Sequence, residues 1–161
     1  MTLDELNAMP VQEAAAAFTK CCGSSGWVGA MVSARPFASV DELMKAADDA
    51  WEAASEDDWH EAFSHHPRIG EQAKGWAASE QSGVRDARAG IRDELAAVNQ
   101  AYEEKFGHIY IVCATGRSAG EMLAIAKERM NNDAATELRV AAAEQHMITR
   151  LRLRKLLGET T

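Results

Sequence analysis

The chain has 161 residues, of which 47% are hydrophobic and 26% are charged, a balance typical of globular rather than disordered proteins. This length is sufficient to bury a core without disulfides or metals, so we expect one domain covering 1–161. The formal net charge of −8 argues against a surface for nucleic acid or anionic membranes, because such surfaces need a basic patch.

The cysteines and the N-terminus indicate the cellular compartment. The three cysteines, Cys21, Cys22 and Cys113, cannot form a closed set of disulfides, so we expect reduced thiols. Met1–Pro10 lacks the basic and apolar parts of a signal peptide, and no apolar run reaches the length of a membrane span. We therefore expect a soluble, cytoplasmic protein with no membrane partner.

Capping patterns and hydrophobic periodicity predict helices along the first half of the chain. Thr2 with Glu5, and Ser39 with Glu42, have the spacing of capping boxes. The second pair precedes apolar residues at intervals of three and four, as in an amphipathic helix. The predicted helices are a short one before Pro10, Val11–Cys21, Ser24–Arg35, one from Ser39 to about Ala54, and Glu56–His65.

The second half is predicted to have longer helices. The expected elements are a loop over 71–78, a helix entry at 79–81, one long helix between Gly83 and Gly107, and helices at about 118–131 and 133–157.

One segment differs in composition from the predicted helices. Ile109–Ala114 is β-like but has no visible pairing partner, so we expect an isolated extended segment. The predicted fold class is therefore all-α: a single-domain bundle of about seven or eight helices with one short extended segment near 109–114.

The sequence His65-His66-Pro67 contains the best candidate for a catalytic group. Pro67 fixes its own backbone and disfavours helical geometry at His66, so the preceding helix ends here and the backbone aims the imidazole. Imidazole is the side chain that most often moves protons near neutral pH. A non-catalytic interpretation stays open, in which both histidines cap the helix or face water.

Metal sites and nucleophiles are not favoured by the sequence. The segment from His60 to His65 is superficially similar to a zincin motif, but these histidines are five positions apart, about 140° around a helix, and do not share a face. The other histidines and Cys113 lack metal-ligand spacing. The adjacent cysteine pair borders an apolar helix, where inert thiols are the usual state. We therefore expect no metal.

The last predicted helix carries one inward arginine. With Ile148 at the centre of its apolar face and about 100° per residue, Arg152 falls on the inward side, whereas Arg150 and Arg154 fall on the opposite side. An inward guanidinium needs an anionic partner. The two interpretations are an internal salt bridge, to Glu144 or to another helix, and a cation that binds a ligand; the sequence favours neither.

Several short motifs occur in order across nearly the whole chain. They are His66-Pro67-Arg68-Ile69-Gly70, Trp76 followed by Glu80-Gln81 and Gly83, Phe106-Gly107 leading into Ile111-Val112-Cys113-Ala114, Gly116-Arg117-Ser118, and Ile148 with Arg152-Leu153. In order and spacing these motifs resemble the OHCU decarboxylase family, where OHCU is 2-oxo-4-hydroxy-4-carboxy-5-ureidoimidazoline, an intermediate of urate breakdown. His-Pro-Arg-Ile-Gly with a downstream Glu-Gln is far more specific than either piece alone.

The resemblance implies an all-helical enzyme without a cofactor, usually a homodimer, that releases CO2 from OHCU to give (S)-allantoin. It implies that His66 and Glu80 are catalytic. Family members commonly have Ser where this chain has Ala77, so a hydroxyl contact is missing here or supplied by Ser79. The substrate-binding positions implied are Pro67, Ala77, Gln81, Tyr110, Ile111, Val112, Cys113, Ala114 and Arg152.

The expected chemistry suits these groups. Loss of CO2 leaves negative charge that the ring carbonyl or imine delocalises, so the protein must orient the carboxylate, stabilise the anion and deliver one proton. We expect His66 to give the proton and Glu80 to hold ring or ureido N–H groups. Gln81 and the backbone of 111–114 would fix the ring, and Arg152 would hold an anionic or carbonyl oxygen.

Two hypotheses from other classes compete with this one. A non-catalytic helical interaction module predicts an exposed apolar groove and a histidine that faces water. A metallohydrolase predicts bound zinc.

Overall fold

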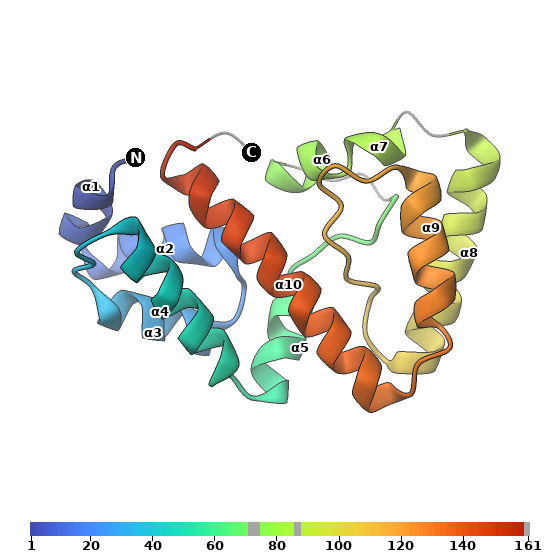
Figure 1. The fold of residues 1–161 in the computed structure, drawn as a ribbon, viewed down its shortest axis with the longest axis horizontal. Coiled ribbons are helices and arrows are strands. Elements are labelled where there is room, and N and C mark those ends of the chain that lie inside the picture. Colours follow the sequence, from blue (N-terminus) through green and yellow to red (C-terminus); the bar gives the residue numbers. More distant parts are fainter. Residues whose placement is uncertain (71–74, 86–87, 160–161) are drawn as a thin grey trace. The chain divides into compact units, whose positions relative to one another are not determined.

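The computed structural model describes residues 1–70, 75–85 and 88–159, and within them every regular element is a helix (Figure 1). The predicted all-α class is therefore confirmed. No helix in this described part combines the length and apolar content that crossing a membrane requires. The helices are α1 (Leu3–Ala8), α2 (Val11–Cys21), α3 (Ser25–Ala34), α4 (Val40–Glu52), α5 (Glu56–Ser64), α6 (Trp76–Glu80), α7 (Ser82–Arg85), α8 (Ala89–Phe106), α9 (Ala119–Arg129) and α10 (Ala134–Leu156).

The chain forms two compact units. The first combines Met1–Ala62 with His146–Thr161, and the second is Phe63–Gln145. Helix α10 contributes residues to both.

The expected count of about seven or eight helices is corrected to ten within the described residues, because three helices lie between 75 and 107, where a loop, a helix entry and one long helix were expected. Helix α6 begins inside the expected loop, directly after Gly75, whose φ of 59° lies in the left-handed region. It ends at Gln81, whose N–H bonds back to Ala77 O at 3.2 Å. The part of the expected loop at 71–74 lies outside the described residues.

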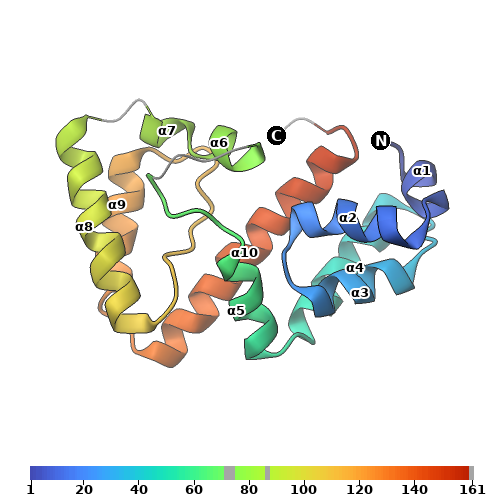
Figure 2. The ribbon, with the colours of Figure 1, turned by 180° about the vertical axis from the view of Figure 1, so that it is seen from behind.

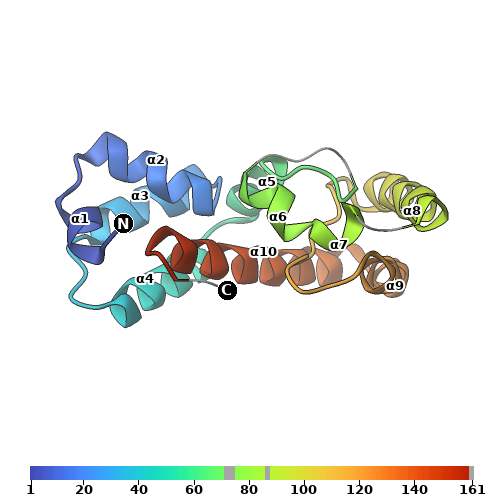
Figure 3. The same cartoon turned by 90° about the horizontal axis from the view of Figure 1, so that it is seen from above.

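Large apolar side chains from α2, α3 and α4 form the core of the first unit. Phe18, Trp27, Met31 and Leu43 are each at most 1% exposed. The Trp27 indole donates from Nε1 to Ala47 O at 3.3 Å, which satisfies its buried polar atom. Figure 3 shows α2 and α3 side by side.

The N-caps predicted at Thr2 and Ser39 are confirmed. Thr2 and Glu5 form a reciprocal capping box at the start of α1. Ser39 accepts a hydrogen bond from the Glu42 N–H at the start of α4. These local contacts satisfy N–H groups that a helix leaves unpaired in its first turn. The helix entry expected at 79–81 is wrong, because α6 begins at Trp76 with Gly75 as its N-cap.

The second unit is built on α8 and α9, which run in the same direction (Figures 1 and 2). Two helices that run in the same direction need a connection that returns along their length, and residues 107–118 provide it. Tyr110–Ala114 within this connection are all buried. Neither helix nor strand is assigned to them, so the expected extended segment is not confirmed.

Gly83 brings α7 into direct contact with the turn before α9. A Cβ on Gly83 would lie 2.5 Å from the backbone O of Arg117 and 3.3 Å from Cα of Ser118. The absence of a side chain at this position therefore sets how closely α7 approaches the turn.

Cys21 and Cys22, at the end of α2, are free and buried. Burial raises the pKa of Cys21 to about 12 and that of Cys22 to about 11, from an ordinary value of 9.0. At neutral pH both thiols are therefore protonated, and a protonated thiol is a poor nucleophile.

We predict that iodoacetamide at pH 8 modifies Cys21 and Cys22 in the folded protein at least about 100-fold more slowly than in the urea-unfolded chain. A higher pKa lowers the thiolate fraction at a fixed pH, and burial also blocks access. Peptide mass mapping of quenched samples measures both rates. Labelling of either native cysteine at the unfolded rate would contradict the prediction.

We predict that Gly83→Ala lowers the free energy of unfolding by about 1–3 kcal/mol, because the added methyl group overpacks against backbone. The matched control is Gly90→Ala at the start of α8, where nothing lies within 4 Å of the added Cβ. Because alanine favours a helix over glycine, this control should be neutral or stabilising by up to about 1 kcal/mol. Urea unfolding followed by circular dichroism compares the two, and equal stabilities would rule out the close approach.

Candidate functional site

His66 lies just beyond the end of α5, where the helix stops before Pro67 as predicted. The His66 N–H closes a last turn onto Phe63 O at 3.1 Å. The imidazole is half-buried, and its Nε2 lies 2.5 Å from Oε1 of Gln145. An amide oxygen only accepts hydrogen bonds, so the contact forms in the tautomer in which Nε2 carries the hydrogen. The contact fixes the direction of the ring.

Gln145 is a residue that the sequence analysis missed. It is fully buried in α10, where a side-chain amide requires hydrogen-bond partners. A signal was available, because Gln145 stands three residues before Ile148 and therefore on the inward face of the same helix. A polar residue on an apolar face marks a position where a specific contact is made.

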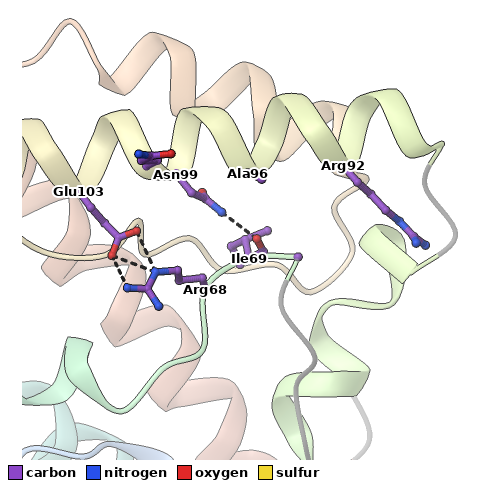
Figure 4. A pocket seen from close by; sticks show the side chains of 8 residues that line it. Arg68, Ile69, Arg92, Ala96, Asn99 and Glu103 are labelled. Carbon is purple, nitrogen blue, oxygen red and sulfur yellow. Dashed lines mark hydrogen bonds and ion pairs between the residues drawn. The ribbon is translucent and has the colours of Figure 1, made fainter.

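The residues after Pro67 are anchored on α8 (Figure 4). Arg68 forms a two-pronged ion pair with Glu103, with its Nε and Nη2 atoms 2.9–3.0 Å from the carboxylate oxygens. The Asn99 amide donates from Nδ2 to Ile69 O at 2.8 Å. A cavity of about 380 Å³ opens beside this anchor, lined by residues of α8 and by Arg68–Gly70. Its described lining includes none of the predicted site residues.

Gln81 joins the two motifs that the sequence analysis considered together. Its Oε1 accepts a hydrogen bond from the Gly70 N–H at 3.1 Å, and the residue is only 8% exposed. Gly70 has a φ of 94°, a conformation that favours glycine. The His66–Gly70 motif and the Glu80-Gln81 pair are therefore in direct contact.

Glu80 is half-buried, and its charge acts on the thiol of Cys113. Burial raises the pKa of Cys113, and the carboxylates of Glu144 and Glu80 raise it further, against the Thr115 backbone and Arg117. The negative charge of Glu80 thus influences the pKa of a residue in the 110–114 segment.

Side chains from outside the segment hold the backbone of Tyr110–Ala114. Glu144 accepts from the Cys113 N–H at 3.3 Å and from Arg117 Nη1 at 3.1 Å. Arg129 Nη1 donates to Ile111 O at 2.7 Å. A buried connection without helix or strand geometry depends on such contacts, because its backbone groups lack regular partners.

Pro67 and Ala77 also lie in the second unit, and both are half-buried. The carbonyl of Ala77 accepts the Gln81 N–H, so it belongs to the turn that ends α6. The hydroxyl of Ser79, the proposed substitute for a serine at position 77, donates to Trp76 O at 2.9 Å.

Arg152 belongs to the first unit, where it is half-buried and its Nη1 lies 3.4 Å from Lys20 O. Its charge also lowers the otherwise raised pKa values of Cys21 and Cys22. Arg150, expected on the face opposite to Arg152, is also half-buried and donates to Asp48 of α4. The expected direction of Arg150 came from the rotation of about 100° per residue alone. That rotation takes no account of Asp48, which lies on another helix.

The structure thus brings most of the predicted site residues into one unit. The ten that lie in the second unit are His66, Pro67, Ala77, Glu80, Gln81, Tyr110, Ile111, Val112, Cys113 and Ala114. Within the described ranges, no three His, Cys, Asp or Glu side chains are grouped so that they could hold a metal ion.

Known proteins resemble this chain along most of its length. The family model of OHCU decarboxylase matches residues 7–154. The uric acid degradation bifunctional protein TTL of Arabidopsis thaliana is 37% identical over 148 residues, which cover 86% of this chain and 46% of that protein. The 2-oxo-4-hydroxy-4-carboxy-5-ureidoimidazoline decarboxylase of Haloferax volcanii is 31% identical over 158 residues, which cover 95% of this chain and 94% of that protein. The chain thus spans about half the length of the plant relative.

Solved structures agree with these sequence matches. The crystal structure of an OHCU decarboxylase in the presence of (S)-allantoin superposes with a TM-score of 0.81 at 41% identity, covering 88% of this chain and 97% of that one. An (S)-allantoin synthase, with a TM-score of 0.77 at 18% identity over 98% of this chain and 54% of that one, shares the fold. From the family match, the relatives and the structures, this chain belongs to the OHCU decarboxylase family.

Proposed function

We propose that this chain decarboxylates OHCU to (S)-allantoin, without a cofactor. The observation that carries the proposal is the contact between Gln81 and Gly70, because it joins the histidine motif to the Glu-Gln pair. Glu80 beside it acts on Cys113 of the 110–114 segment. Membership of the family supports the same reaction.

The reaction needs an electron sink, a proton and a fixed substrate. The bond between C4 and the carboxylate breaks, CO2 leaves, and the electron pair is delocalised onto the adjacent ring carbonyl or imine. The proton that replaces CO2 comes from His66 and is delivered to one face of the ring. The substrate ring supplies the electron sink that a cofactor would otherwise provide.

The remaining groups hold the substrate in this scheme. Glu80 accepts hydrogen bonds from ureido or ring N–H donors, and Gln81 with the backbone of Tyr110–Ala114 fixes the ring. Pro67 and Ala77 also contact the substrate. Because Ala77 has no hydroxyl, the substrate makes one contact fewer at this position than in family members that have Ser there. Positioning of this kind contributes to the rate because it removes orientational freedom before the chemical step.

Further parts of the proposal come from the resemblance. Arg152 binds an anionic or carbonyl oxygen of the substrate, which stays a prediction. The chain acts as one catalytic domain over 1–161, works in the cytoplasm and forms a homodimer. The family match over 7–154 supports the extent of the domain.

We predict that His66→Asn lowers kcat by about 10²–10⁴-fold, the usual contribution of a general acid. The assay follows freshly generated OHCU by circular dichroism as (S)-allantoin forms. The matched control is His65→Asn, which changes the exposed neighbouring histidine and should keep normal turnover. Full activity of the His66 variant would remove this residue from the mechanism. Absence of activity in the unmodified protein would favour the helical interaction module.

We predict that Glu80→Gln lowers kcat/KM by about 10–100-fold, because hydrogen bonds to a charged group are worth about 1.5–3 kcal/mol. The glutamine keeps the shape of the side chain but loses the charge that attracts N–H donors. Glu104→Gln, an exposed change on α8, serves as the control and should have no effect. If both variants match the parent protein, Glu80 is a surface residue of α6.

A further inference from the structure

Arg129 and Glu137 form a buried ion pair in the second unit, with side chains 7% and 0% exposed. Arg129 contacts Glu137 Oε1 through Nε at 2.7 Å and through Nη2 at 2.5 Å. Tyr102 donates its hydroxyl to the same oxygen at 2.5 Å, and Asn132 donates to the other oxygen at 3.0 Å. Both oxygens of the carboxylate therefore accept hydrogen bonds, and the guanidinium is held in one orientation.

The guanidinium also packs against aromatic rings. Its central carbon lies 4.9 Å from the ring centre of Tyr110 and 5.8 Å from that of Tyr102. With two nitrogens on Glu137, the third nitrogen, Nη1, points to Ile111 O at 2.7 Å. The planar fork of arginine makes this division possible, whereas the single nitrogen of lysine could not serve both partners in the same way.

These contacts tie one carbonyl of the connection to three helices. Tyr102 comes from α8, Arg129 from α9 and Glu137 from α10. A buried ion pair is by itself weak evidence of stabilisation, since apolar residues of similar volume often serve as well. An apolar residue, however, cannot donate a hydrogen bond to Ile111 O. The directed donor is thus the property that distinguishes Arg129 from a residue that only fills the core.

We propose that Arg129, locked by Glu137, is a positioning residue for the decarboxylation: it fixes the Ile111 carbonyl and so the backbone of the 110–114 segment that holds the substrate. This inference rests on the proposed function. Arg129 acts through the segment and does not touch the substrate. Loss of its donor lets the segment shift, so the substrate sits less well against the proton donor.

The test removes both charges of the pair together, in Arg129→Met with Glu137→Gln. Methionine fills the space of the arginine stem, and glutamine keeps an acceptor for the Tyr102 hydroxyl. Because no charge is left buried and unpaired, this double variant should fold. Arg129→Lys is the second variant, and Arg139→Lys, an exposed change on α10, is the matched control.

Three quantities are measured with freshly generated OHCU: kcat, KM and the enantiomeric excess of the allantoin formed. Enzyme is used at a concentration where spontaneous decay is negligible. We expect both Arg129 variants to fold, with kcat/KM lowered by about 100-fold through a higher KM, and with a lower excess of (S)-allantoin. The Arg139 variant should match the parent protein.

A merely structural role gives a different result. Fewer active molecules would lower the apparent kcat but leave KM and the enantiomeric excess unchanged, and this outcome would overturn the proposal. Failure of both Arg129 variants to fold would also overturn it, because the pair would then serve stability alone. If the parent protein itself does not decarboxylate OHCU, the proposed function fails and the positioning role fails with it.

Discussion

The hydrogen bond from the Gly70 N–H to the Gln81 side chain is the contact on which the candidate site depends. It connects the backbone corner after His66 with the end of α6, and so with Glu80. The other side of the same corner is tied to α8 through Arg68 and Asn99. A histidine aimed by a proline is useful to an enzyme only if the corner that carries it is itself fixed. Here backbone and side-chain contacts fix it from two directions.

The sequence was sufficient for features that depend on neighbours in the chain. Caps such as Thr2 with Glu5 need only residues three positions apart, and the helix stop before Pro67 follows from the geometry of proline. The all-α class follows from periodicity. Family resemblance selected the candidate residues, and ten of them lie in one unit.

Features that depend on contacts between distant parts of the chain could not be predicted from the sequence. The break that separates α6 from α7 arises where Gln81 turns toward Gly70 and Gly83 meets the Arg117 backbone, and neither contact is visible in a hydrophobic pattern. Gln145 and the pair of Arg129 with Glu137 were missed for a related reason. Buried polar residues cannot be told from surface residues in a sequence until their partners are known, and these partners come from other parts of the chain.

The first unit is discontinuous in the sequence, so the order of synthesis affects when it can fold. Residues 146–161 close that unit, yet they leave the ribosome after the whole of the second unit has been synthesised. Asp48 gains its partners His146 and Arg150 only then. Domains generally fold in the order in which they emerge, starting at the N-terminus. In this protein the middle of the chain can complete its fold first, while the first 62 residues wait for the rest of α10 to emerge.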